Sequence, residues 1–172
     1  MKAQGKLHSA NGSDDNLSPT PEPNGLSGEG IQQVDTSYLE SLMGYNARRA
    51  SIRIVAKFMR RMSVYQLRPV DFSVLSLIIH NDGITSRQLC ASLGLQPPNL
   101  VAMIAALEKR ELIERRPHPK DGRALGLHAS TQGYKLMVDA EQTAAQLERE
   151  ATSKLSAAEC RTLIHLLKKI YL

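Results

Sequence analysis

The sequence predicts a mainly α-helical protein with one short two-stranded β-hairpin, and three observations lead to this fold class. Over most of the chain after residue 34, apolar residues recur at the three-to-four-residue spacing of amphipathic helices. Two of the expected helices are separated only by Gly94-Leu95-Gln96, which has the length and glycine content of the turn in a helix-turn-helix. The next segment changes period and contains the Asp-Gly step that favours a hairpin turn.

Residues 1–34 differ in composition from the rest of the 172-residue chain. They are rich in Gly, Pro, Ser and Asn, and they hold two lysines and four carboxylates, a net charge of −2. Because the whole chain carries +5, residues 35–172 carry +7. We expect a disordered N-terminal tail over 1–34, which has little to bury, followed by one basic domain over 35–172.

The sequence gives no sign of export or of membrane insertion. The N-terminus lacks the apolar stretch of a secretory signal, and the longest uncharged stretch, 88–107, is interrupted by Gly94 and two prolines. Cys90 and Cys160 lie 70 residues apart and do not suggest a disulfide framework. We therefore expect a cytoplasmic protein without a membrane partner.

The first two expected helices cover about 35–65 and 69–80. In the first, Ser37 and Glu40 have the spacing of a capping box, and apolar residues follow at helical intervals in one long amphipathic helix. The second begins at Pro69, which suits the first turn of a helix. It is apolar on nearly every side, so we expect it to be central and buried.

The helix-turn-helix follows. Thr85 and Gln88 form another capping-box pattern, and Gly94 occupies the position of a helix-ending glycine. Pro97 then begins a helix that runs to about Arg110.

The period changes after this helix. Residues 112–116 and 124–128 are strand candidates on either side of a turn-rich loop over 117–122. A two-stranded hairpin in this place is a wing, so the sequence predicts a winged helix-turn-helix over 69–128.

Two more helices complete the chain, one beginning at Ser130 or Thr131 and the other capped by Ser156. These helices and the first one carry apolar stripes that the central domain cannot all cover. A two-fold dimer is the commonest way to cover such stripes, the alternative being that the helices fold back within one chain. We expect 35–65 and 131–172 to be dimerisation helices.

The order of these parts resembles the MarR-type winged helix-turn-helix transcriptional regulators. The resemblance is carried by LRPVDFSVL at 67–75, GITSRQLCASLGL at 83–95, NLVAMIAALEKRELIERRP at 99–117 and DGRA at 121–124. It implies a homodimer that binds a palindromic double-stranded DNA operator, with one recognition helix per subunit in successive major grooves and the wings at the flanking minor grooves. It also implies a sequence-specific repressor that a small molecule, often a phenolic or aromatic acid, releases from DNA.

Candidate base contacts lie at the start of the recognition helix. Asn99 and Gln96 can pair bidentately with adenine, and Val101 or Ala102 can contact a thymine methyl. The family often has Arg or another polar residue at the position of Ala102, which puts strong guanine readout in doubt and shifts weight to DNA shape and the wing. The candidate contacts of this helix are Gln96, Pro98, Asn99, Val101 and Ala102.

The wing is basic, with six basic and three acidic residues over 109–123. Such cations suit phosphates and the narrow minor groove. By resemblance, Asp121 braces the wing through an ionic contact, and Arg123 faces DNA or that brace. The candidate wing contacts are Arg115, Arg116, His118, Lys120 and Arg123.

A basic stripe runs along one face of the first helix, away from the recognition helix. Its members follow at intervals of four residues, where like charges repel. They are Arg49, Arg53, Lys57 and Arg61. One interpretation is a solvated face, paired with Glu148 and Glu150.

The other interpretation of the stripe is an effector site. The resemblance implies an effector pocket between the dimer helices and the winged domain. We expect Tyr45, Asn46, Arg49 and Arg53 to line it. An aromatic carboxylate, or a coenzyme A thioester with its phosphates, suits these cations.

An enzyme is not expected, because the sequence contains no glycine-rich phosphate loop, no paired-carboxylate segment and no nucleophile elbow. The histidines lack zinc-site spacing, so no metal or cofactor is expected. Two other functions stay open. One is a redox-responsive MarR-type regulator that uses Cys90, although its place beside Leu89 favours a small buried thiol. The other is a winged-helix adaptor that binds proteins and has no operator.

Overall fold

The computed structural model describes residues 34–118 and 121–172, without the side chains of 118 and 121–124. The predicted disordered tail therefore lies outside the described residues, apart from Val34. The chain divides into two units, 1–36 and 37–172, and the second unit contains all the helices and strands described below.

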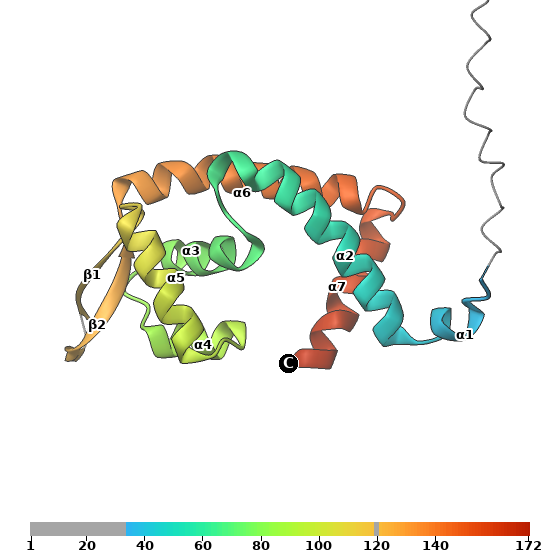
Figure 1. Cartoon of the computed structure of the whole chain (residues 1–172), viewed down its shortest axis with the longest axis horizontal. Coiled ribbons are helices and arrows are strands. Elements are labelled where there is room, and N and C mark those ends of the chain that lie inside the picture. The colour runs from blue at the N-terminus through green and yellow to red at the C-terminus, as the bar shows by residue number, and fades with distance from the viewer. Residues whose placement is uncertain (1–33, 119–120) are drawn as a thin grey trace, which may run out of the picture. The chain divides into compact units, whose positions relative to one another are not determined.

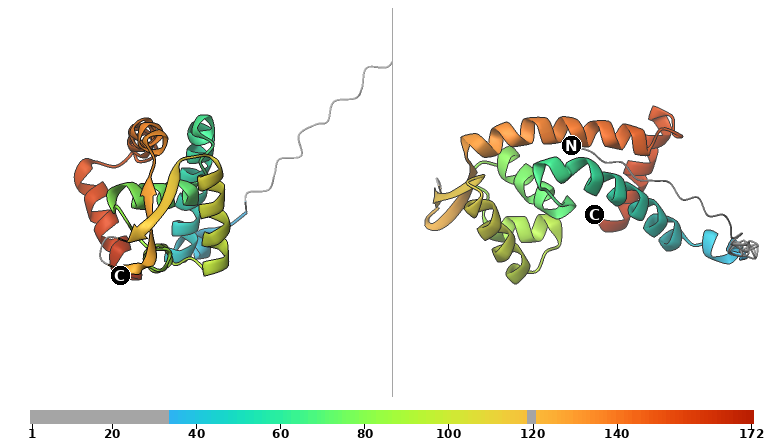
Figure 2. Two further views of the ribbon diagram at one scale, coloured as in Figure 1. Left: turned by 90° about the vertical axis from the view of Figure 1, so that its left-hand side faces the viewer. Right: turned by 45° about the horizontal axis from the view of Figure 1, so that its top comes forward.

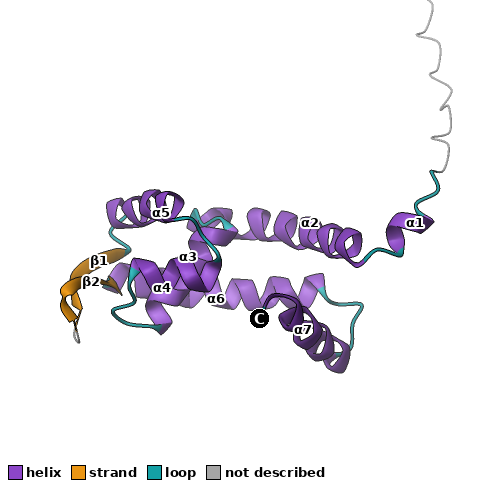
Figure 3. Ribbon diagram, turned by 90° about the horizontal axis from the view of Figure 1, so that it is seen from below, coloured by secondary structure: helices purple, strands orange, loops and turns teal. Residues whose placement is uncertain are grey.

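The second unit is mainly helical, as predicted (Figure 1). The first helical part consists of α1 (Ser37–Glu40), α2 (Met43–Met62) and a 3₁₀ turn over Ser63–Tyr65. The central part consists of α3 (Pro69–His80), α4 (Ser86–Leu93), α5 (Pro97–Lys109), β1 (Ile113–His118) and β2 (Asp121–Ala129). The last part consists of α6 (Thr131–Ala151) and α7 (Ala157–Tyr171). Helices α2 and α6 pack on each other, with the wing and α7 at opposite ends (Figures 2 and 3).

The prediction of one continuous helix over 35–65 is wrong, because the chain breaks at Ser41 and Leu42. Leu42 is extended (φ −91°, ψ 126°). The break is stabilised by Asn46, whose side-chain amide donates hydrogen bonds to the carbonyl oxygens of Glu40 (2.7 Å) and Leu42 (2.8 Å). A side chain six residues away thus satisfies a carbonyl that a continuous helix would have bonded itself.

The other helix boundaries agree closely with the prediction. Thr85 with Gln88, and Ser156 with Glu159, form reciprocal capping boxes. Gly94 ends α4 in the left-handed region (φ +63°), which glycine adopts without steric cost. The turn between α4 and α5 is therefore the short turn that the sequence predicts.

The wing is longer than predicted. Strand β1 ends at His118 and β2 begins at Asp121, so the loop expected over 117–122 is wrong at both of its ends. Antiparallel pairing runs from Ile113 opposite Ala129 to Pro117 opposite Leu125, and the register shifts after Pro117. The strands extend because cross-strand pairing, rather than local turn propensity, decides where they end.

The base of the wing is attached to the turn between α3 and α4. Leu127 donates a backbone hydrogen bond to Ile84 (2.9 Å) and accepts one from Gly83 (3.1 Å). A side chain at Gly126 would place its Cβ 2.8 Å from the Gly83 carbonyl oxygen. Glycine at 126 therefore permits this close approach of two backbones.

The core lies around α3, as the apolar character of that helix predicts. Val74, Leu75 and Ile78 of α3 are fully buried. They belong to one cluster with buried side chains of α2, α4, α5, the wing and α6, among them Met62, Leu89, Ile104, Leu127 and Met137.

Apolar side chains are also exposed in large number on α1, α2 and α7. Helix α7 contains no buried residue. Its exposed aliphatic side chains are Leu163, Ile164, Leu166, Leu167 and Ile170. Among the described residues, no single helix has the length and apolar composition to span a membrane; only α4 and α5 together, bent by 116°, meet that test.

Candidate nucleic-acid interface and ligand groove

Helix α5 has two opposite faces, which the sequence pattern determines. Leu100, Met103, Ile104 and Leu107 are buried against the core. Between residues 98 and 106, the solvent-exposed side chains on the other face are Pro98, Asn99, Val101, Ala102, Ala105 and Ala106. The predicted contacts within α5, Pro98, Asn99, Val101 and Ala102, are all among these six exposed residues. We call the six residues the reading face.

The start of α5 adds a polar group to the reading face. Gln96 is the N-cap residue, but its side chain makes no capping hydrogen bond. It is exposed and extends the polar part of this surface beside Asn99. Both side chains carry the amide group that pairs with adenine in a major groove.

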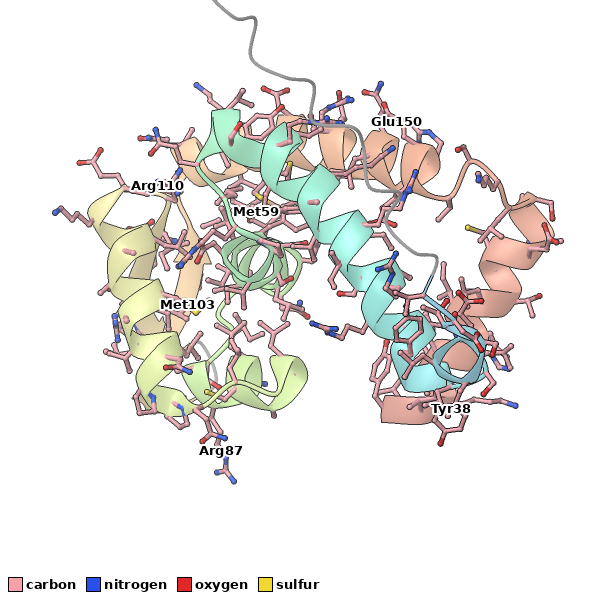
Figure 4. The ribbon with its side chains drawn as sticks, turned by 45° about the vertical axis from the view of Figure 1, so that its right-hand side comes forward. Tyr38, Met59, Arg87, Met103, Arg110 and Glu150 are labelled. Carbon is pink, nitrogen blue, oxygen red and sulfur yellow. The ribbon has the colours of Figure 1, made fainter. Side chains whose placement is uncertain are left out.

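Arg87 is a candidate DNA contact that the sequence analysis missed. It lies in the first turn of α4, is exposed, and projects away from the ribbon (Figure 4). In helix-turn-helix proteins the first helix of the motif crosses the DNA backbone, where a cation contacts phosphate. The signal was available in the sequence, because a basic residue lies two positions after the capping residue Thr85.

Two of the predicted wing contacts form ion pairs within the described chain. Arg115 Nε and Nη2 donate to the two carboxylate oxygens of Glu108 in α5 (2.7 and 3.2 Å). Hydrogen bonding to Glu108 raises the pKa of Arg115 above its ordinary value. Arg116 pairs with Glu114 of the same strand. Arg115 therefore joins the wing to α5 through an ion pair, and the brace that the resemblance implied for Asp121 stays a prediction.

The remaining wing predictions fall on residues whose side chains are not described. His118, Asp121 and Arg123 lie in the strands, but their side chains are outside the described part of the molecule. Lys120 is outside the described residues altogether. The structure therefore leaves these four as predictions from the sequence.

Arg110, directly after α5, connects the reading helix to the α2–α3 junction. Its Nη1 donates to the carbonyl oxygen of Gln66 (2.9 Å) and its Nη2 to that of Tyr65 (2.8 Å). The Tyr65 hydroxyl lies 2.9 Å from the Thr143 hydroxyl in α6. This contact set, which links three helices, has no signal in the sequence because its partners are 44 or more residues apart.

His128 joins the wing to the α3–α4 turn from inside the fold. It is buried, and its Nδ1–H donates to Asp82 Oδ1 (2.6 Å). Its Nε2 is buried without a hydrogen-bond partner within the described part of the chain. The pair adds to the backbone bonds that attach the base of the wing.

Three members of the basic stripe on α2, Arg49, Arg53 and Lys57, line an open groove of about 490 Å³. Glu150 of α6 pairs with Arg61 (3.1 Å) and approaches Lys57 (4.0 Å), so the predicted pairing with Glu150 is confirmed for these two residues. No ion pair engages Arg49, Arg53 or Arg60 over residues 34–118 and 121–172. We call this cavity the basic groove; it is lined by Arg49, Ile52, Arg53, Ala56, Lys57 and Arg60.

The four predicted effector residues do not share one cavity. Arg49 and Arg53 line the basic groove, but Tyr45 and Asn46 do not. Asn46 instead stabilises the break before α2 and lines a second groove of about 560 Å³, which is almost entirely apolar and lies between α2 and α7. Tyr45 is half-buried and lines neither groove.

Cys90, the candidate redox residue, is half-buried in α4 and packs against the core cluster. This placement agrees with the small packed thiol that its position beside Leu89 suggests.

Comparisons with known proteins agree with this arrangement. The model of the MarR family matches residues 65–124. The structure is similar to that of the transcriptional repressor CouR bound to a 23-mer DNA duplex, with 31% sequence identity, a TM-score of 0.76, and coverage of 81% of this chain and 99% of CouR. CouR bound to p-coumaroyl-CoA is also similar, with 30% identity, a TM-score of 0.72, and coverage of 80% and 97%. A relative from Thauera aromatica, a putative transcriptional regulatory protein for the hcr operon, is 28% identical over 130 residues, which are 75% of this chain and 78% of the relative.

Proposed function

This chain belongs to the MarR family of transcriptional regulators, and from that premise we propose that it is a homodimeric repressor whose DNA binding is relieved by an anionic aromatic effector, an aromatic acid or its coenzyme A thioester. Residues 69–128 read a palindromic operator. Residues 35–65 and 131–172 form the dimer and carry the effector site.

The geometry of the reading face supports DNA binding. In this class of domain the second helix of the motif enters the major groove with its N-terminal residues toward the base edges. Gln96 and Asn99 are exposed at that end of α5. Arg87 is exposed on α4, where it can contact a phosphate group. The net charge of +7 over 35–172 attracts the polyanion.

The exposed apolar side chains of α1, α2 and α7 support the dimer. An apolar surface of this extent on a small domain indicates a protein interface. A second copy of the chain meets it with the same surface, in the two-fold arrangement that a palindromic operator requires.

The observation that carries the effector assignment is the set of three arginines in the basic groove without an acidic partner in the described chain. Guanidinium groups bind carboxylates and phosphates through paired N–H donors. Their repulsion across one helix face costs stability that an anion restores. CouR, which is 30% identical to this chain, binds p-coumaroyl-CoA.

A ligand series tests the effector. Purified protein is mixed with p-coumaroyl-CoA, p-coumarate or coenzyme A, and its melting temperature and its affinity for the DNA upstream of its own gene are measured. An effector raises the melting temperature, because it binds the native state, and weakens DNA binding. A result in which all three compounds leave both quantities unchanged contradicts this effector class.

Two double variants locate the site. Arg49→Ala with Arg53→Ala is expected to abolish the response to the ligand while DNA affinity without ligand stays within about twofold, since neither residue lies on the reading face. Arg48→Ala with Arg61→Ala is the matched control, because these arginines lie on the same helix but do not line the basic groove. Equal loss of response in both variants argues against a specific groove.

A salt series separates this function from that of an adaptor without an operator. Affinity for the upstream DNA is expected to fall linearly on logarithmic axes with a slope of about −0.9 per phosphate contacted. Affinity for unrelated DNA at the same salt is expected to be at least about a thousandfold lower. Equal affinity for both DNAs favours the adaptor.

A further inference from the structure

The chemistry of the reading face narrows the kind of base pair that it can recognise. Among its six exposed residues, Asn99 alone has a side chain that can donate or accept a hydrogen bond. The other five are prolyl, valyl or alanyl side chains.

The arrangement on the helix places small side chains at the centre. Pro98, Ala102, Ala105 and Lys109 follow at intervals of four, three and four residues and therefore share one line along α5. Val101, which is 59% exposed, lies on one side of this line, and Asn99 lies on the other. The two alanines on this line allow the helix backbone to lie close to the floor of a groove, with Val101 and Asn99 at its edges.

Guanine is not matched by this surface. Bidentate readout of guanine O6 and N7 requires Arg or Lys. Lys109 is the first cation on the central line, and it lies 11 residues, or about 16 Å, along the helix from Pro98. That distance puts it at the opposite end from the residues that reach base edges in a helix-turn-helix.

The nearest arginines are engaged elsewhere. Arg115 donates to Glu108, and Arg110 donates to two backbone carbonyl groups. Within the part of the chain that the structure describes, Arg87 on α4 is the one arginine between residues 83 and 118 that forms no ion pair or side-chain hydrogen bond.

We propose that α5 reads A·T base pairs, through contacts of Val101, Ala102 and Ala105 with thymine methyl groups and through the amides of Asn99 and Gln96 with adenine. In the major groove, thymine is the base that presents a methyl group, and adenine pairs with an Asn or Gln amide at N6 and N7. This specificity rests on the proposed function, because it requires α5 to enter a major groove.

The test begins with selection of bound duplexes from a randomised library by the full-length protein. The selected half-sites are expected to contain A·T pairs where α5 is centred. Each thymine of the selected duplex is then replaced by deoxyuridine, which removes only the methyl group. Loss of a buried methyl contact is expected to weaken binding about fourfold.

A thermodynamic cycle assigns the contact. In Val101→Ala, replacement of thymine by deoxyuridine is expected to cause no further loss of affinity at one position, because the side chain that touched the methyl group is shortened. Val34→Ala, before α1, is the control: this valine is 74% exposed and lies outside the residues assigned to DNA reading and to the dimer, so the loss of affinity with deoxyuridine is retained. Both variants change exposed side chains, and their melting temperatures verify the fold.

The outcomes are distinct. Enriched half-sites with G·C pairs under α5, or half-sites in which deoxyuridine binds as well as thymine, overturn A·T readout while leaving a sequence-specific regulator in place. A library that yields no enriched sequence overturns the proposed function itself, and the specificity with it.

Discussion

Replacement of Arg110 by alanine is expected to destabilise the fold by about 2–3 kcal/mol. The substitution removes two hydrogen bonds from a charged donor, to the carbonyl groups of Tyr65 and Gln66 at 2.8 and 2.9 Å. Such bonds contribute about 1.5–3 kcal/mol each, and the lower end applies because the guanidinium is only half-buried. At roughly 3 °C per kcal/mol for a domain of this size, the melting temperature falls by about 8 °C.

The assay is thermal and chemical unfolding of Arg110→Ala, measured at equal protein concentration because a dimer melts in a concentration-dependent way. Lys109→Ala is the control: Lys109 is an exposed neighbour on the same helix turn, and its loss is expected to change stability by less than about 0.5 kcal/mol. Arg110→Lys is expected to lie between the two, because a single ammonium group cannot span both carbonyl groups.

DNA binding distinguishes this role from a phosphate contact. If Arg110 holds the reading helix, Arg110→Ala lowers the preference for the specific duplex but leaves the salt dependence of binding unchanged. If Arg110 contacts phosphate, the slope of the salt dependence falls by about one. A stability loss below about 0.5 kcal/mol, or a reduced slope, would refute the reasoning.

Three further predictions follow from contacts described above. Gly133→Ala is expected to lose at least about 3 kcal/mol in unfolding experiments, because its Cβ would lie 2.1 Å from a backbone carbonyl oxygen of the α5–β1 turn, and retained stability would show that this turn can shift. Glu108→Gln is expected to tighten non-specific DNA binding and steepen its salt dependence, since it removes a negative charge and frees Arg115; an unchanged slope would mean that this arginine stays away from phosphate. Hydrogen bonds from the backbone and hydroxyl of Ser156 lower the pKa of Glu159. The stabilisation of α7 by the Glu159 carboxylate is therefore complete above the ordinary value of 4.5 and is lost as the pH falls through the lowered pKa. The circular dichroism of Glu159→Gln is expected to lack that acid transition.

The parts of the fold that could be predicted are those determined by neighbouring residues. Capping boxes join residues three apart, as at Thr85, and the left-handed helix end at Gly94 depends on one residue. Both were visible in the sequence. The break at Ser41 was not, because it depends on Asn46 reaching back six residues to a carbonyl oxygen.

The candidate site shows the same division. Helical spacing placed Asn99 and Val101 on the exposed face of α5. The sequence could not show that Arg115 would pair with Glu108, because that contact depends on how the turn between α5 and β1 folds. Arg110 was missed for the same reason, since its partners are backbone carbonyl groups, which every residue carries.

The attachment of the wing base has a consequence for how a ligand can act. Paired backbone bonds at Leu127, the close approach at Gly126 and the bond from buried His128 to exposed Asp82 attach the hairpin to the α3–α4 turn. In each protomer of the proposed dimer, we expect α5 and the hairpin to move together as one rigid body. We expect release from DNA to change the distance between these two bodies relative to the helical repeat of the duplex, while each body keeps its own shape.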